Sequence, residues 1–255
     1  MVGLGEIGSP ILEVISKKFL VVGFDLNPKL MNVEKWNKLT NVKTELIHFC
    51  IPYSSSFIDT ILKFSKEHNA GAIVIHSTIP PYTTERIQRK TTIPVIYSAT
   101  RGIHKRMRKD LKRYVKFFSI SDRIANKQWA KTTFEKRMKK AGVRTKQMSS
   151  PLTLELAKIV VDTSYYGWLI NYAQLSNMIA IQHKVNYDEM WSFSDEIHKF
   201  LGNRPKMFPG FIGGHCVIPN LDLIHNQTLD LIKEINDMYV KKVKNAKTIA
   251  KKYAK

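Results

Sequence analysis

The chain has 255 residues, of which 44% are hydrophobic and 24% are charged, as in an ordinary globular protein with one large or two smaller domains. It contains no apolar run of about 18 residues, and a glycine-rich segment at Gly3 stands where a secretory signal would begin, so we expect a cytoplasmic protein without a membrane helix. Its two cysteines, Cys50 and Cys216, are far apart and outside any Cys-x-x-Cys pair, so we expect neither a disulfide framework nor a metal site.

The formal net charge is +20, and it is unevenly distributed along the chain. The stretch from Arg101 to Lys146 holds 17 lysines and arginines against three acids, and the last 15 residues hold seven lysines and no acid. Such a surface attracts phosphates and nucleic acids. Because no RNA-recognition, zinc-finger or helix-turn-helix signature accompanies it, we interpret it as a solvated face and do not expect nucleic-acid binding.

The first 150 residues alternate short apolar runs with polar, helix-like segments. Nearly continuous β-branched and aromatic runs are typical of buried parallel strands, and helical connections between them imply right-handed crossovers. We therefore predict that residues 1–150 form a Rossmann-type α/β domain with a doubly wound, mostly parallel sheet. The expected strands lie within 19–25, 44–52, 71–78, 94–100, 116–122 and 143–148.

Three glycines near the start, Gly3, Gly5 and Gly8, have the G-x-G-x-x-G spacing. In a dinucleotide site these glycines allow a tight turn, close approach of the pyrophosphate and close helix packing, and the following helix points its N–H groups at the phosphate. Asp25 ends the next apolar run at the distance expected for an acceptor of a ribose hydroxyl, which favours NAD over NADP. Only two residues precede the turn, so we predict a stunted first strand or a start further upstream.

From residue 151 to 255 the sequence predicts an all-helical domain. The segment 152–183 has no proline and one glycine and is apolar on more than one face, which indicates a long central helix at a subunit interface. We therefore expect a homodimer through this helix. Further helices are expected over 187–200 and 221–254.

The loop between these last two helices reads FPGFIGGHCVIPN, residues 208–220. A cysteine placed after Gly-Gly-His and before a proline is a poor choice for a core, so we interpret Cys216 as part of an active site and not as a buried filler or a metal ligand. Cys50, His48 and His76 lie within strand runs, and we expect them to be core residues. Lys158, on the apolar helix, has two open interpretations: an active-site lysine, or a structural ion pair with Asp162 four residues later.

Together, the segments GLGEIG…FDLNP, HSTIPPYTT, ELAKIVVDTSYYGWLINYAQ and PGFIGGHCVIPN resemble the nucleotide-sugar dehydrogenases that oxidise UDP-glucose, UDP-N-acetylmannosamine or GDP-mannose. The resemblance implies NAD as cofactor and an alcohol oxidised through an aldehyde, with the cysteine forming a thioester. It implies cofactor contacts from Gly3, Gly5, Glu6, Ile7, Gly8, Asp25, Pro52 and Thr78. The implied catalytic residues are Cys216, Lys158, Asp162, Asn220 and Thr78. We expect an anionic small-molecule substrate to contact Arg101, His104, Gly213, Gly214 and His215.

The sequence also departs from this family. The family carries Asn four residues after its lysine and Asp four residues after its cysteine, whereas here these positions hold Asp162 and Asn220, a compensated exchange. Thr100 stands where the family has a Glu that assists thioester hydrolysis, and the cysteine loop is one residue shorter. The resemblance ends at Asn220, so we expect a shortened member without the family's C-terminal nucleotide-sugar domain.

Three functions therefore remain open. The first is an NAD-dependent oxidoreductase that acts on an alcohol or aldehyde of an anionic sugar with Cys216 as nucleophile. The second is a two-electron dehydrogenase of the 3-hydroxyacid or 6-phosphogluconate kind, which would use Lys158 and not need the cysteine. The third is a non-catalytic nucleotide-binding subunit.

Overall fold

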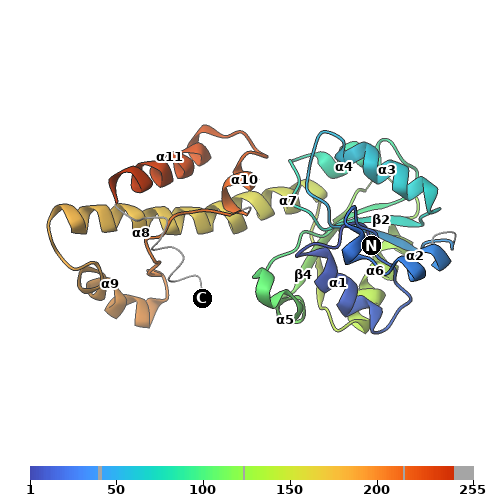
Figure 1. Ribbon diagram of the computed structural model, residues 1–255, viewed down its shortest axis with the longest axis horizontal. Helices are drawn as coiled ribbons and strands as arrows, with labels where there is room; N and C mark the ends of the chain where they lie inside the picture. The colour runs from blue at the N-terminus through green and yellow to red at the C-terminus, as the bar shows by residue number, and fades with distance from the viewer. Residues whose placement is uncertain (40–41, 123, 215, 244–255) are drawn as a thin grey trace. The chain divides into compact units, whose positions relative to one another are not determined.

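The computed structural model describes residues 1–39, 42–122, 124–214 and 216–243. The chain divides into two compact units, Met1–Lys158 and Ile159–Lys255, which are described separately below (Figure 1).

The first unit is built on a five-stranded sheet with the strand order β1-β2-β3-β4-β5. β1, β2 and β3 pair in parallel, as do β4 and β5, whereas β4 runs antiparallel to β3. The prediction of a mostly parallel, Rossmann-type sheet is therefore confirmed. The strands are β1 (Leu46–Phe49), β2 (Ala72–Ile75), β3 (Val95–Tyr97), β4 (Lys116–Ile120) and β5 (Thr145–Gln147).

One of the expected strands is nearly absent, and another runs antiparallel to its neighbour. The run 19–25 forms only an isolated bridge, from Phe24 to Val2, because Gly3 turns away with a φ of +87° and leaves a single residue to pair. Val2 also bridges to Phe49, so it takes the place of a very short strand beside β1. β4 is antiparallel to β3 because the segment between them, which contains α5, does not cross to the other end of the sheet. β4 therefore begins at the end of the sheet where β3 ends.

Helices cover both faces of this sheet (Figure 1). Alternate strand residues face opposite ways: Ala72 and Val74 pack against α1, α5 and α6, whereas Ile73 and Ile75 pack against α3, α4 and α7. The helices of this unit are α1 (Gly8–Ser16), α2 (Val33–Leu39), α3 (Phe57–Glu67), α4 (Thr83–Gln88), α5 (Met107–Arg113), α6 (Lys127–Lys140) and α7 (Pro151–Leu156), with short 3-10 turns at Pro28–Leu30 and His104–Arg106.

The expected long helix over 152–183 consists of three successive parts. α7 is followed by a π-helical segment, η3 (Ala157–Ser164), and then by α8 (Tyr165–Gln182). Within η3, the Ser164 hydroxyl donates to the carbonyl oxygen of Val160 at 2.5 Å. Since π-helical turns occur often at functional sites, this segment is notable because it carries both Lys158 and Asp162.

The remaining helices are α9 (Tyr187–Leu201), α10 (Val217–Leu221) and α11 (Gln227–Lys242). The prediction of one continuous helix over 221–254 is wrong in its first part. α11 begins only at Gln227, because the side chain of Asn226 accepts the N–H groups of Thr228 and Leu229 and caps the helix there. Residues 244–254 of the predicted helix lie outside the described residues.

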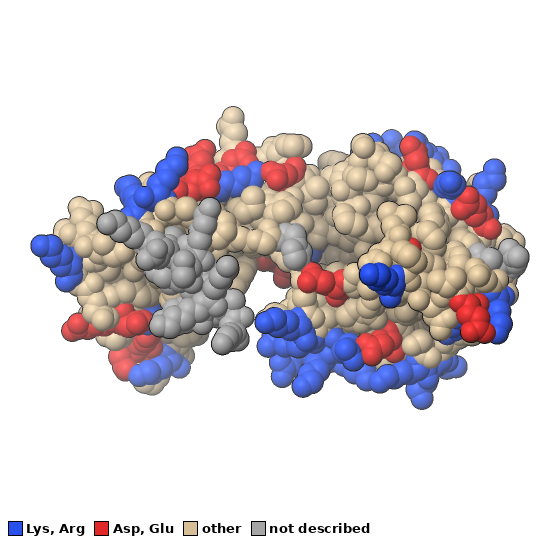
Figure 2. Space-filling view, in the orientation of Figure 1, with Lys and Arg blue, Asp and Glu red and all other residues tan. Residues whose placement is uncertain are grey.

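The surface of the first unit is strongly basic around α5, where Figure 2 shows lysine and arginine side chains gathered together. In the described part of the chain, no helix combines the length and the hydropathy that crossing a bilayer requires.

Candidate functional site

The glycine-rich turn between Val2 and α1 has the backbone form that a bound pyrophosphate needs. Gly3 has a φ of +87°, and a Cβ on Gly8 would lie 1.8 Å from the Gly3 carbonyl oxygen, so no other residue fits at Gly8. A Cβ on Gly5, by contrast, would meet no atom within 4 Å. The turn is therefore closed on its inner side and open above Gly5, which leaves room for a ligand to approach the backbone.

Asp25 is tied to this turn through its carboxylate. Its Oδ2 accepts the N–H of Leu4 at 2.7 Å, and its Oδ1 accepts the N–H of Asn27 at 2.8 Å. Each carboxylate oxygen has a second lone pair, so these bonds leave the half-buried side chain able to accept from ribose hydroxyls. The turn and Asp25 together fit an NAD-type dinucleotide.

The basic segment after β3 lies beside the same turn. His104, which was predicted to bind substrate, approaches Glu6, which was predicted to bind cofactor, with 2.7 Å between Nδ1 and Oε2. Arg101 donates to the carbonyl oxygen of Val115 at 2.9 Å and lies over the ring of Phe117 at 5.0 Å. Two predicted regions are therefore brought together in the first unit.

Three further predicted cofactor residues belong to loops around the turn and the sheet edge. Ile7 is partly buried against the core beneath α1, and Pro52 is exposed just beyond β1. Thr78 is half-buried in the loop after β2, and this loop is tied to the one after β1 by a 2.5 Å hydrogen bond from the Ser77 hydroxyl to the carbonyl oxygen of Ile51.

Glu155 of α7 holds the far end of that loop and was not identified from the sequence. Its fully buried carboxylate accepts the N–H of Tyr82 at 2.6 Å, and the N–H and hydroxyl of Thr84 at 2.9 and 2.7 Å. Burial raises the pKa of Glu155, while the hydrogen bonds from Thr84 and Tyr82 act against that shift. The carboxylate therefore joins the start of α4 to the helix that leads into Lys158.

Lys158 and Asp162 are both half-buried on the π-helical segment η3. Lys158 is the last residue of the first unit, and Asp162 belongs to the second. The structure therefore places the predicted lysine and carboxylate on one short segment, at the point where the two units meet in the sequence.

In the second unit, the predicted nucleophile lies at the surface. Cys216 is exposed and immediately precedes α10, and Asn220 is half-buried four residues further along that helix. Gly213 and Gly214 are exposed, and Gly214 has a φ of +81°, whereas His215 lies outside the described residues.

Buried amides that sequence reasoning missed hold this loop in place. Gln174 of α8 donates to the carbonyl oxygen of Gly210 at 2.7 Å and to the Oδ1 of Asn236 at 3.0 Å. Asn236 of α11 also pairs with the N–H and carbonyl of Ile212 at 2.8 and 3.2 Å. An Asn or Gln on an otherwise apolar helix face is the signal that would have indicated this clamp.

Of the three residues expected in the core, the two histidines are buried there, and Cys50 is partly buried against it. His48 and His76 are buried, and their Nδ1 and Nε2 atoms lie 2.9 Å apart. Burial is the main cause that lowers the pKa of His48 to about 3 and raises the pKa of Cys50 to about 12, so both groups are neutral at neutral pH. Among the described residues, no group of three or more His, Cys, Asp and Glu side chains is arranged to hold a metal ion.

The sequence matches no protein-family model and no curated protein. Solved structures do match. A UDP-D-ManNAc dehydrogenase from Pyrococcus horikoshii aligns with a TM-score of 0.75 and 19% identity over 93% of this chain and 68% of its own. A UDP-N-acetyl-mannosamine dehydrogenase from Staphylococcus aureus aligns with a TM-score of 0.64 and 18% identity over 93% of this chain and 67% of its own.

A third solved structure matches along nearly its entire length. The 3-hydroxyisobutyrate dehydrogenase from Mycobacterium tuberculosis aligns with a TM-score of 0.64 and 13% identity over 99% of this chain and 98% of its own. At identities this low, the likeness establishes the fold that the chain shares with these dehydrogenases: a Rossmann-type α/β unit followed by helices.

Proposed function

We propose that this protein is an NAD-dependent oxidoreductase that acts on an alcohol group of an anionic small molecule. The observation that carries the proposal is the turn at Gly3–Gly8, which is sterically closed beneath Gly8, open above Gly5 and bonded to Asp25. The dehydrogenase names of the structural neighbours agree with it.

Each part of the first unit has a task in this proposal. The backbone N–H groups at the start of α1 hold the pyrophosphate, and Asp25 accepts from the ribose. When bound, NAD supplies an acceptor for the hydride of the substrate's carbinol carbon. The basic segment after β3, which contains Arg101 and approaches the turn through His104 and Glu6, attracts the anionic group of the substrate.

Two versions of this function differ in the role of Cys216. In the first, the substrate is a nucleotide sugar or phosphosugar, and the exposed thiol adds to the aldehyde that the first oxidation forms. Loss of a second hydride to NAD then gives a thioester that water hydrolyses, with Lys158, Asp162 and Asn220 assisting. The exposure of Cys216 in its amide-clamped loop favours this version.

In the second version, the enzyme removes two electrons from a hydroxy acid, and Lys158 is its main polar group. The alignment with the 3-hydroxyisobutyrate dehydrogenase agrees with this version. Cys216→Ser separates the two versions. Complete loss of turnover supports the first, and unchanged NADH formation supports the second.

The general proposal is tested with Gly5→Ala. An alanine at position 5 has open space, so the variant should fold with an unchanged Tm. Its Cβ would block the backbone from the pyrophosphate, so calorimetry should show NAD binding to the parent protein and none to the variant. NADH absorbance is then measured over a panel of nucleotide sugars, sugar phosphates and hydroxy acids. A parent protein that binds no NAD contradicts the proposal and favours the non-catalytic subunit.

We also propose that the protein forms a homodimer through the 152–183 helix. Several apolar side chains on η3 and α8 are exposed, including Val161 at 68%, Tyr165 at 57% and Tyr172 at 62%. Large exposed apolar surfaces of this kind are typical of interfaces. A monomeric mass by light scattering would contradict the proposal, and Tyr172→Glu is expected to shift a dimer toward monomer.

A further inference from the structure

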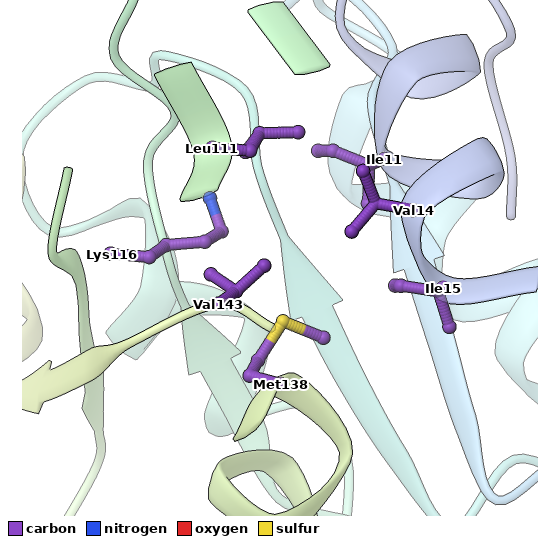
Figure 3. Close-up of a pocket in the computed structure, with 7 residues that line it drawn as sticks. All are labelled: Ile11, Val14, Ile15, Leu111, Lys116, Met138 and Val143. Carbon is purple, nitrogen blue, oxygen red and sulfur yellow. The ribbon is translucent and has the colours of Figure 1, made fainter. Parts of the chain in front are cut away.

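Lys116, the first residue of β4, is a buried lysine without an assigned task. Its side chain is only 6% exposed. Figure 3 shows its aliphatic part among apolar side chains from α1, α5 and α6, including Ile11, Leu111 and Met138. The cavity between them measures about 10 Å³, enough for about one water molecule. Burying a lysine in such surroundings is costly, so its amine must have specific partners.

The amine of Lys116 meets three uncharged oxygen atoms. Its Nζ lies 3.0 Å from the carbonyl oxygen of Ser98, 3.4 Å from that of Ala99 and 3.0 Å from the hydroxyl oxygen of Thr100. A carbonyl can only accept, whereas a hydroxyl can donate or accept. A neutral amine has two N–H groups for the two carbonyls and one lone pair, which the Thr100 hydroxyl can fill as donor. An ammonium would instead give its three N–H groups to the same three oxygens, so the contacts fit both protonation states, and all three partners are uncharged.

The burial and the charges around this amine favour its neutral state. Burial is the main cause that lowers the pKa of Lys116 to about 7, and the positive charges of Arg101 and Lys158 lower it further. The Cys50 thiol acts in the opposite direction. His48 in β1 and His76 after β2 also interact electrostatically with the amine, and burial keeps both uncharged by lowering the pKa of each. The amine is therefore largely free to accept a proton just above neutral pH.

Thr100, which is 7% exposed, follows β3 beyond the carboxyl end of that strand, where the proposed substrate would bind. Its N–H donates to the carbonyl oxygen of His76 at 3.3 Å, so the loop after β3 lies against the loop after β2 that carries Thr78. His76 Nδ1 also lies 3.1 Å from the Ser98 carbonyl oxygen that Lys116 contacts. In open α/β sheets, ligands bind beyond the carboxyl ends of the parallel strands, which is where this pair lies.

We propose that Thr100 and Lys116 form the proton-accepting pair of the oxidoreductase, an inference that rests on the function proposed above. The substrate hydroxyl gives its proton to Thr100 Oγ1 while the Thr100 proton passes to the lone pair of Lys116 Nζ. The O–H electrons of the substrate form the second C–O bond, and the carbinol hydrogen leaves with its electron pair to NAD. The products are the carbonyl compound, NADH and a protonated Lys116, which returns its proton to solvent. Thr100 is the catalytic residue of the pair, and Lys116 acts through it.

The experiment compares Thr100→Val, Thr100→Ser and Lys116→Met with the parent enzyme, and Lys146→Met on β5 serves as control because Lys146 is exposed. NADH formation is followed against pH, and the side-chain carbon resonance of Lys116 is titrated by NMR in the parent and in T100V. We expect kcat to fall at least about 100-fold in T100V and K116M. T100S should retain most activity, and K116M should lose the decline in rate that the parent shows below about pH 7.

The outcomes separate this inference from the function on which it rests. Parental turnover and an unchanged pH profile in T100V and K116M overturn the pair, as does a Lys116 resonance that titrates near the value of a free lysine. A parent protein that binds no NAD and forms no NADH overturns the proposed function, and the catalytic role of the pair falls with it. A T100V variant that loses turnover while NAD binding and Tm stay at parental values supports the pair.

Discussion

The substitution Lys116→Met should change how the stability of the protein depends on pH. In the folded protein burial lowers the pKa of Lys116 from 10.5 to about 7. Between these two values the unfolded chain holds a proton on Lys116 that the folded chain has lost. The free energy of unfolding therefore contains a contribution that rises with pH in this window. Below about pH 7 the full cost of burying the amine is present, and above 10.5 it is absent.

The size of this effect follows from the shift itself. At 1.36 kcal/mol for each pKa unit, and with the amine half-protonated at pH 7, the contribution changes by about 2 kcal/mol between pH 7 and pH 9. Methionine fills a similar volume and has no titrating group, so K116M lacks this change. The stability of K116M relative to the parent should therefore be about 2 kcal/mol more favourable at pH 7 than at pH 9.

Urea unfolding of both proteins at the two pH values measures this difference, and contributions from other titrating groups cancel between them. The exposed Lys146→Met is the matched control and should show no pH-dependent difference. A K116M difference that is the same at both pH values would refute the reasoning, because Lys116 would then titrate alike in the folded and unfolded chains.

Further predictions concern the groups that hold the candidate site. Glu155→Ala leaves the buried donors at the start of α4 without an acceptor and should lower the free energy of unfolding by about 3 kcal/mol in urea, whereas the exposed Glu67→Ala should change it by less than about 0.5 kcal/mol. For the exchanged pair, the double variant Asp162→Asn, Asn220→Asp should raise the activation free energy, measured from kcat, by less than the sum of the increases in the two single variants. Additive increases would count against compensation. Asn236→Leu leaves the clamped loop without its partner and should cost about 2 kcal/mol and accelerate thiol modification of the exposed cysteine; an unchanged modification rate would show that the clamp does not control the loop.

Much of the first unit was predictable because its signals are local. Each of the five strands β1 to β5 lies within one of the expected apolar runs, with β4 in the run at 116–122. Short apolar runs of this length are typical of buried strands. The direction of β4 and the reduction of the run at 19–25 to one bridge were not predictable. Both depend on which segments pair across the sheet, and a local sequence pattern does not predict that pairing.

The candidate site likewise contains residues that the sequence identified and residues that it did not. Gly3, Gly8 and Asp25 were identified because backbone geometry dictates residue type at fixed spacing, and the structure places Asp25 on the turn as a hydrogen-bond acceptor. Lys116 and Glu155 were missed. Each lies in a segment that reads as an ordinary strand or helix, and its importance comes from burial and from partners 16 to 18 or 71 to 73 residues away in the chain.

The sequence by itself therefore determined the layered α/β plan, the helical second half, the glycine-rich turn and the loop that carries Cys216. These features follow from hydrophobic periodicity and from residue types that are specific to one backbone conformation or one chemical role. Only the tertiary structure decided that Lys116 is buried with three oxygens around its amine and that Glu155 ties the Thr78 loop to the helix of Lys158. The physical reason is that burial and hydrogen-bond partners are set by segments far apart in the chain, and burial lowers the pKa of this lysine to about 7.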